Sequence, residues 1–110
     1  MKLFVYGTLK QGYGNNRILD GATFLGNTQA PGALYTGYSF PMAVEGEGDI
    51  QGELWEINKE HLAMCDRLES HPRMYKRTEV RLLNGVQAYI YYWQGATGGL
   101  RYLPNGEWNR

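Results

Sequence analysis

Hydrophobic and polar residues follow each other in short runs along most of the chain, which predicts a fold built mainly from β-strands. Residues 3–6 are apolar or aromatic and the run stops at Gly7, a pattern that predicts a buried strand near the start. Residues 22–28 form a second candidate strand, in which Gly26 marks a candidate bulge. Residues 50–57 alternate without a cleanly polar face, as expected for a curved strand near the interior of a barrel.

The second half of the chain carries the clearest local signals. Asn58 can cap a helix that is predicted to continue to about Ser70, because the proline at position 72 ends it. Residues 75–93 contain two strand-like runs separated by Asn84-Gly85, the sequence typical of a tight hairpin turn. A helix followed by a β-hairpin is therefore predicted.

Glycine and proline residues predict where the chain turns. Pro31-Gly32 is interpreted as a turn, and the acidic, glycine-rich residues 45–49 are interpreted as the solvated connection of a hairpin. The apolar residues 40–44 include Pro41, which cannot donate a ladder hydrogen bond. This segment is therefore placed at a sheet edge or at a bend.

Composition and charge narrow the classes of function. The chain has 110 residues, and residues 1–110 are expected to form one domain with a single core. Eleven basic and eleven acidic residues balance without charged runs, so neither nucleic acid nor a charged membrane surface is indicated as a partner. Neither a signal peptide nor an apolar run approaching the ~20 residues of a membrane span is apparent. The one cysteine suits a reducing cytoplasm, and with two histidines it makes a poor set of metal ligands.

Glu69 stands out among the carboxylates when the predicted helix is projected at about 100° per residue. It then lies about 20° from Leu62 and about 40° from Cys65, inside the apolar stripe. A buried carboxylate has a raised pKa, which suits a group that takes and returns a proton near neutral pH. The alternative is a carboxylate that turns outward in the last turn, and the projection does not separate the two. Tyr75 begins the next strand and is expected to hydrogen-bond into the same pocket, whereas Cys65 is expected to be a core residue.

The loop after the first strand is the second candidate. Tyr6-Gly7-Thr8-Leu9 joins the buried strand to a polar, glycine-rich segment. A glycine lets a ligand approach the backbone closely. The N–H groups of Thr8 and Leu9 have no expected strand partner, so an anion or a developing oxyanion would satisfy them. An ordinary turn explains the same pattern, and the residues alone leave both interpretations open.

Six segments, in the same order, resemble the γ-glutamylcyclotransferase-like proteins. They are the Tyr-Gly-Thr-Leu loop at 6–9, residues 12–19 with their asparagines, Phe-Pro-Met-Ala-Val at 40–44, the strand 50–57 with Gly-Glu-Leu-Trp, residues 66–77, and Gly-Glu-Trp at 106–108. The likeness covers nearly the whole chain. The sequence departs from the family pattern at Ser70, where the family usually has glycine, and at Glu107, where it has aspartate.

The resemblance implies an α+β fold, a small mixed β-barrel with flanking helices, and a small-molecule γ-glutamyl substrate. It implies that Glu69 is the catalytic acid and base. It places substrate-binding residues at Tyr6, Gly7, Thr8, Leu9 and Tyr75. The implied reaction is attack of the substrate's α-amine on its own γ-carbonyl, which releases 5-oxoproline and an amine or amino acid and needs no metal or cofactor. The alternatives are a non-catalytic module that binds a glutamyl- or 5-oxoproline-like group and an amidase that uses water. Neither the leaving amine nor the oligomeric state is predicted.

Overall fold

The computed structural model describes residues 1–109, which form one six-stranded sheet, one α-helix and one 3-10 helix. In chain order the elements are β1 (Lys2–Val5), the 3-10 helix η1 (Gly14–Leu19), β2 (Thr23–Thr36), β3 (Pro41–Glu56), α1 (Lys59–Leu68), β4 (Tyr75–Arg81), β5 (Gln87–Trp93) and β6 (Arg101–Leu103). The strand order is β4-β5-β1-β3-β2-β6. Neighbouring strands are antiparallel except β1 and β5, which are parallel.

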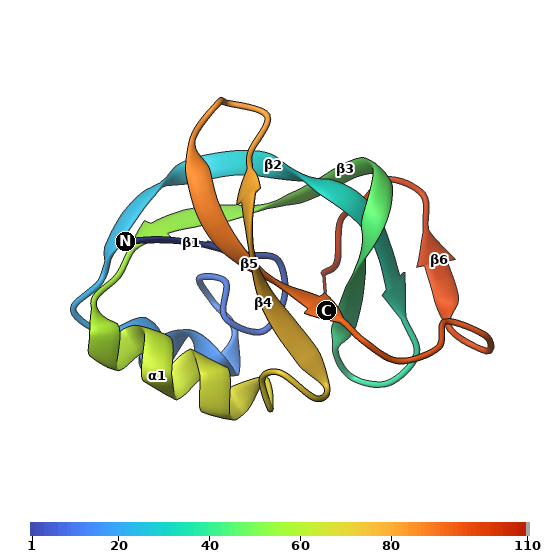
Figure 1. Cartoon of the computed structure of the whole chain (residues 1–110), viewed down its shortest axis with the longest axis horizontal. Helices are drawn as coiled ribbons and strands as arrows, with labels where there is room; N and C mark the ends of the chain where they lie inside the picture. Colours follow the sequence, from blue (N-terminus) through green and yellow to red (C-terminus); the bar gives the residue numbers. More distant parts are fainter. Residues whose placement is uncertain (110) are drawn as a thin grey trace.

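The long strands β2 and β3 bend, so that the sheet curls into a half-barrel with α1 beside one open side (Figure 1). The N–H of Leu83, which follows β4, donates to the carbonyl of Gln29 in β2 at 3.0 Å and helps to close the curl. The helices η1 and α1 contact each other. The fold is therefore the α+β, mixed-sheet barrel with flanking helices that the resemblance implies.

The side chains of β1 alternate between two hydrophobic clusters. Phe4 and Tyr6 belong to a cluster formed mainly by β2, β3 and β5. Leu3 and Val5 belong to a second cluster, which includes Cys65 of α1. Residues 3–6 are buried on both faces, which is why this part of the chain is continuously apolar.

Two of the predicted turns are wrong, because both lie inside strands. The ladder between β2 and β3 shifts its register at Pro31-Gly32, opposite residues 44–49. Residues 45–49 are exposed, as expected, but they continue β3, and residues 37–40 make the actual connection between the strands. Glycine marks a bulge as readily as a turn, which explains both errors. Pro41 is the first residue of β3, a position where its missing N–H costs little.

The signals for the helix start and for the hairpin are confirmed. The Asn58 side chain accepts a hydrogen bond from the N–H of His61 at 2.9 Å, and His61 Nδ1 accepts one from the N–H of Asn58 at 3.1 Å. These two bonds form a capping box at the start of α1. Strands β4 and β5 form the predicted hairpin, and Gly85 at its tip has a φ of 89°.

The end of α1 differs from the prediction, because the helix stops at Leu68. The N–H groups of Ser70 and His71 donate to the carbonyls of Arg67 and Asp66 at 3.2 and 2.9 Å, the paired bonds of a Schellman motif. Ser70 has a φ of 52°, in the left-handed region that favours glycine. The left-handed conformation of Ser70 ends the helix. It also fixes the backbone direction at the C-cap residue, Glu69.

Ser70→Gly is expected to raise the free energy of unfolding by about 0.5–1 kcal/mol, because glycine adopts a positive φ without the steric cost of a Cβ. Urea denaturation followed by circular dichroism measures the change. Ser70→Ala is the matched control, since it keeps the Cβ and should not stabilise the protein. Equal stabilisation by alanine would contradict the role of φ at this position.

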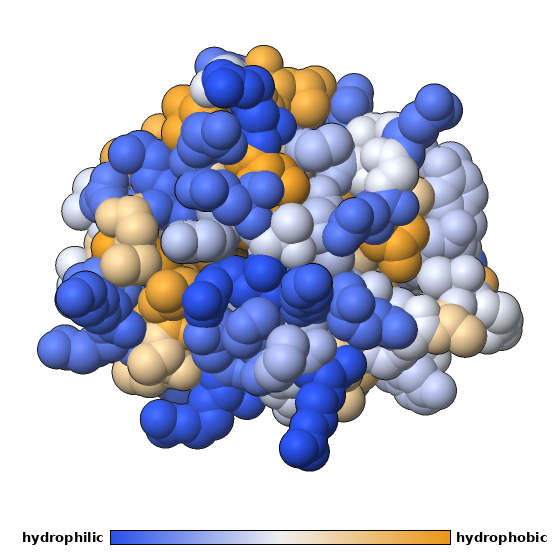
Figure 2. Space-filling model, viewed as in Figure 1, coloured by the Kyte–Doolittle hydropathy of each residue, from blue (hydrophilic) through white to orange (hydrophobic). Residues whose placement is uncertain are grey.

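Polar and charged residues cover most of the face shown in Figure 2, and hydrophobic residues appear there as separate patches. Within residues 1–109, no helix combines the length and the apolar character needed to cross a membrane. The large hydrophobic side chains that remain exposed include Leu68 and Met74, at 38% and 44% of full exposure. Both lie next to the cavity described below.

Candidate active site

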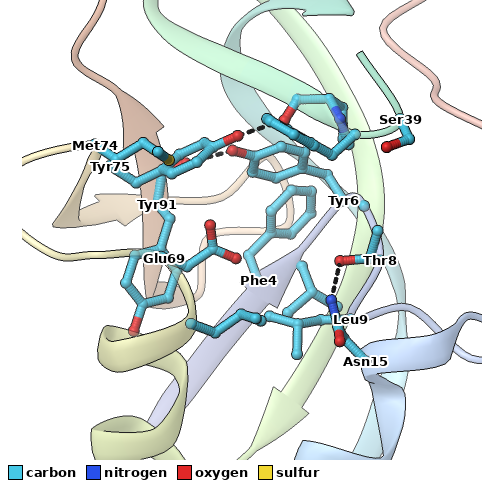
Figure 3. Close-up of a pocket in the computed structure, with 15 residues that line it drawn as sticks. Phe4, Tyr6, Thr8, Leu9, Asn15, Ser39, Glu69, Met74, Tyr75 and Tyr91 are labelled. Carbon is cyan, nitrogen blue, oxygen red and sulfur yellow. Dashed lines mark hydrogen bonds between the residues drawn. The ribbon is translucent and has the colours of Figure 1, made fainter.

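A cavity of about 330 Å³ opens where the end of β1, the start of β3 and the C-terminal end of α1 meet (Figure 3). A volume of this size is typical of a small-molecule site. The lining residues are Phe4, Val5, Tyr6, Gly7, Thr8, Leu9, Asn15, Ser39, Phe40, Pro41, Leu68, Glu69, Met74, Tyr75 and Tyr91. All six residues predicted for the site are therefore brought together around one cavity.

Among the residues that the structure describes, Glu69 is the one charged residue that lines this cavity. It is the C-cap of α1, and its side chain is half-buried, with the carboxylate directed into the cavity towards Phe4 and Tyr6 (Figure 3). Within residues 1–109 the carboxylate has neither a hydrogen-bond donor nor a cation as partner. Burial raises the pKa of Glu69 to about 7. Both ionisation states of the carboxylate are therefore populated near neutral pH.

The two tyrosines beside Glu69 already have hydrogen-bond partners. The Tyr75 hydroxyl donates to the carbonyl of Pro41 at 2.9 Å. The Tyr6 hydroxyl donates to the carbonyl of Tyr91 and accepts a hydrogen bond from the N–H of Ala43 at 3.4 Å. Burial raises the pKa of both tyrosines, and the charges around them, including that of Glu69, add to the increase. Both hydroxyls therefore stay neutral and hold the walls of the cavity in place.

The loop after β1 has unpaired amides. Within residues 1–109, the N–H groups of Gly7, Thr8 and Leu9 donate to no backbone or side-chain acceptor. The acceptors of the same loop are used: Asn15 Nδ2 donates to the Thr8 hydroxyl at 2.8 Å, and Asn16 Nδ2 donates to the carbonyl of Leu9 at 2.8 Å. The two asparagines thus fix the loop while three successive donors are left for a ligand.

Two further contacts hold this loop. A Cβ on Gly7 would lie 2.7 and 2.9 Å from Cγ and Cδ of Pro41, so the glycine is required by close packing against the start of β3. Lys10 is 8% exposed, and its Nζ donates to the carbonyl of Trp108 at 2.7 Å. The loop is therefore fixed by the nearby asparagines and by two distant parts of the sequence, at Pro41 and at Trp108.

An ion pair connects the end of α1 to the hairpin. Arg77 of β4 forms a salt bridge with Asp66 of α1. The Tyr91 hydroxyl donates to the other carboxylate oxygen of Asp66 at 2.6 Å, and the N–H of Arg77 donates to His71 Nδ1 at 2.9 Å. These bonds surround the turn that carries Glu69 and hold it against the sheet.

Nine of the fifteen lining residues were not predicted as site residues, and four of these carry a heteroatom in the side chain: Asn15, Ser39, Met74 and Tyr91. Tyr91 could have been found, because it faces the same side of the predicted hairpin as Tyr75. The other three lie in η1 or in connecting segments, where no periodicity indicates the direction of a side chain.

Other candidate groups lie away from this cavity. Cys65 is fully buried, and burial raises the pKa of its thiol to about 12, so it is a core residue as expected. Glu53 is 8% exposed, and its Oε1 accepts hydrogen bonds from the N–H of Gln11 and from Trp55 Nε1 at 3.0 and 3.1 Å. The part of the chain that the structure describes has no group of three His, Cys, Asp or Glu side chains that could hold a metal ion.

Residues 3–110 match the protein family described as "Gamma-glutamyl cyclotransferase, AIG2-like". The chain belongs to this family. A γ-glutamylcyclotransferase family protein of Escherichia coli K12, YtfP, is 32% identical over 109 residues, which cover 98% of this chain and 96% of the relative. The γ-glutamylaminecyclotransferase of Rattus norvegicus is 33% identical over 110 residues, 87% of this chain and 68% of that protein.

The fold of the family is also seen in a solved structure. The crystal structure of a protein from Pyrococcus horikoshii superimposes with a TM-score of 0.82 and 29% sequence identity, over 97% of this chain and 88% of that one. Family membership supports a γ-glutamylcyclotransferase-like activity for this chain. The cavity described above contains a carboxylate whose pKa burial raises to about 7 and a set of free amide donors.

Proposed function

We propose that this chain is a γ-glutamylcyclotransferase that cleaves a γ-glutamyl amide or amine, with Glu69 as both base and acid. The observation that carries the proposal is the state of Glu69, a partnerless carboxylate in a mostly apolar cavity whose pKa burial raises to about 7. The family supports the class of reaction. The name of the rat relative supports a γ-glutamyl amine as substrate.

In the proposed reaction, Glu69 removes a proton from the substrate's α-ammonium group. The resulting amine attacks the γ-carbonyl carbon, a C–N bond closes a five-membered ring, and an electron pair moves onto the carbonyl oxygen. When the carbonyl re-forms, the bond to the leaving nitrogen breaks. The ring nitrogen loses two protons in all, and Glu69 transfers them one at a time to the leaving nitrogen, which departs as an ammonium ion. The other product is 5-oxoproline, and Glu69 ends as a carboxylate.

The amides of Gly7, Thr8 and Leu9 are proposed to bind the negatively charged part of the substrate. Within residues 1–109, neither a lysine nor an arginine lines the cavity. The backbone N–H groups are therefore proposed as donors for the glutamyl carboxylate or for the oxyanion that develops on the γ-carbonyl. Tyr6 and Tyr75 are proposed to support binding through their rings, because their hydroxyls are already bonded to the backbone.

A second candidate function is a non-catalytic module that binds a glutamyl- or 5-oxoproline-like group. The same three amides would serve it. Glu69 disfavours this function, because an unpaired carboxylate repels an anionic ligand and adds a cost without a benefit to binding. In the proposed enzyme, in contrast, the carboxylate of Glu69 attracts the positively charged ammonium group of the substrate, so its place in the cavity favours binding.

Incubation with a panel of γ-glutamyl amines, followed by mass spectrometry, tests the proposal. Release of 5-oxoproline together with the free amine is the expected result. Glu60→Gln is the matched control, since Glu60 is an exposed carboxylate in the first turn of the same helix. Binding of 5-oxoproline without turnover of any substrate would instead favour the module.

The pH dependence of the proposed reaction follows from the pKa of Glu69. Only the ionised carboxylate accepts a proton from the substrate, so kcat/KM should rise with pH through an apparent pKa near 7, the value to which burial raises this group. The profile is measured between about pH 3.5 and pH 9 on wild type and on Glu60→Gln, which should behave alike. A profile that rises near pH 4.5, the ordinary value, would show that a solvated carboxylate is the base.

A further inference from the structure

The unpaired amides of the loop after β1 belong to a tight turn. The N–H of Lys10 donates to the carbonyl of Gly7 at 3.0 Å, the bond from the fourth residue to the first that is typical of a β-turn. Thr8 and Leu9 are its two central residues, and their N–H groups find no acceptor within such a turn. Figure 3 shows Thr8 across the cavity from Glu69. The direction of these amides therefore depends on how the two ends of the turn are held.

Both ends of the turn are held at one residue of β3. Val5, the last residue of β1, pairs with Glu53 across the ladder between β1 and β3. The N–H of Gln11, directly after the turn, donates to Glu53 Oε1 at 3.0 Å. Glu53 therefore lies beside the start of the loop through its backbone and binds the end of the loop through its side chain.

The side chain of Glu53 is itself fixed. It is 8% exposed, and the same Oε1 accepts a second hydrogen bond from Trp55 Nε1 at 3.1 Å. Trp55 is buried, and its ring packs edge-on against that of Phe24 at a centroid distance of 5.5 Å. An acceptor held in this way has little freedom to move, so it sets the position of the Gln11 amide.

The burial of Glu53 is not explained by the strand alone. Within residues 1–109 its carboxylate forms no salt bridge, so burial removes it from water without a cation to offset the cost. It does not line the cavity either. Of its two hydrogen bonds in this part of the chain, the bond from Gln11 is the one that connects β3 to another segment. The loop is therefore the part of the molecule that this glutamate supports.

We propose that Glu53 is a positioning residue for substrate binding: by holding the amide of Gln11, it directs the N–H groups of Thr8 and Leu9 into the cavity. This inference rests on the proposed function, in which those amides bind the negatively charged part of the substrate. Glu53 has no contact with the substrate and transfers no proton. Loss of its acceptor oxygen should therefore weaken binding and leave unchanged the pH dependence that Glu69 produces.

Two substitutions separate the hydrogen bond from the space that the side chain fills. Glu53→Met keeps a long side chain and removes the acceptor, whereas Glu53→Gln keeps an acceptor oxygen. Calorimetric titration with 5-oxoproline measures the effect, because this molecule carries both a carboxylate and a carbonyl oxygen. The expected Kd is about tenfold higher for Glu53→Met than for wild type, and within about threefold of wild type for Glu53→Gln. Glu47→Met is the matched control, since Glu47 is an exposed glutamate of the same strand.

Turnover of a γ-glutamyl amine separates positioning from proton transfer. In Glu53→Met, kcat/KM should fall by about the same factor as the affinity for 5-oxoproline, and its apparent pKa should stay near 7, the value to which burial raises Glu69. An unchanged Kd in Glu53→Met, an equal loss in Glu53→Gln, or a shifted apparent pKa would overturn the inference and leave the proposed function intact. Absence of both 5-oxoproline binding and 5-oxoproline release in wild type would overturn the proposed function and the inference with it.

Amide hydrogen exchange of the wild type, followed by NMR, tests the inference without any variant. The Gln11 amide should be protected in the free protein, because Glu53 holds it. The amides of Thr8 and Leu9 should exchange rapidly in the free protein and become protected when 5-oxoproline binds. Rapid exchange of the Gln11 amide in the free protein, or no protection of Thr8 and Leu9 in the complex, would overturn the inference.

Discussion

Glu69→Gln is expected to lower kcat by about a hundredfold or more, because glutamine cannot accept a proton and no other carboxylate among residues 1–109 lines the cavity. Its fold should be intact. Burial raises the pKa of Glu69 to about 7, so the ionised form destabilises the native state, and the wild type loses stability as pH rises from about 4.5 to about 7. The variant does not undergo this loss. Above pH 7 its free energy of unfolding should match or exceed that of wild type, by on the order of 1 kcal/mol, because the carboxylate faces a cavity open to water.

Two measurements on the same samples check this expectation. Turnover is measured as 5-oxoproline release, and stability as the urea midpoint at pH 5 and pH 8. Glu60→Gln, with an exposed carboxylate on the same helix, serves as the control for both. Near-normal turnover by Glu69→Gln would remove Glu69 from the chemistry and with it the proposed mechanism.

Acetylation of the substrate's α-amine is expected to abolish cleavage completely. An acetylated nitrogen is no longer a nucleophile, so the ring cannot close even when the rest of the molecule still binds. The intramolecular reaction is favoured because both reacting atoms are on one tether, an entropic advantage of several kcal/mol. A water-using amidase would not depend on that amine.

The comparison uses one γ-glutamyl amine and its N-acetyl form, with all products resolved by mass. The proposed reaction gives 5-oxoproline and free amine from the first compound and neither from the second. Acetyl-glutamate from the second compound would identify an amidase. Binding of the N-acetyl form, measured as competitive inhibition, shows that loss of cleavage is not simply loss of binding.

Local sequence signals predicted those parts of the fold that local interactions determine. The helix cap at Asn58 and the hairpin turn at Asn84-Gly85 depend on residues within three or four positions of each other, and both are confirmed. The long strands β2 and β3 were divided incorrectly at Pro31-Gly32 and at residues 45–49. Their continuity depends on pairing across the sheet, which the order of residues along one strand does not reveal.

The same distinction holds for the site. The helical projection placed Glu69 on the side of Leu62 and Cys65, and the structure shows its carboxylate in a cavity, although the helix stops before it. The catalytic role of Glu69 stays a prediction. The hydrogen bond from the Tyr75 hydroxyl to Pro41 joins elements that are distant in the sequence. The bond from Asn15 to Thr8 depends on how the loop after β1 folds back on itself. Such contacts set the state of the site without leaving a pattern in the sequence.

The hydrogen bond from Lys10 to the carbonyl of Trp108 spans 98 positions of the chain. A ribosome synthesises the Tyr-Gly-Thr-Leu loop among the first residues of this sequence, but the partner that secures Lys10 is added much later. The loop therefore acquires all of its contacts only once position 108 has been translated and is free to dock. Ligand binding in this protein is expected to mature after synthesis of the domain, not during it.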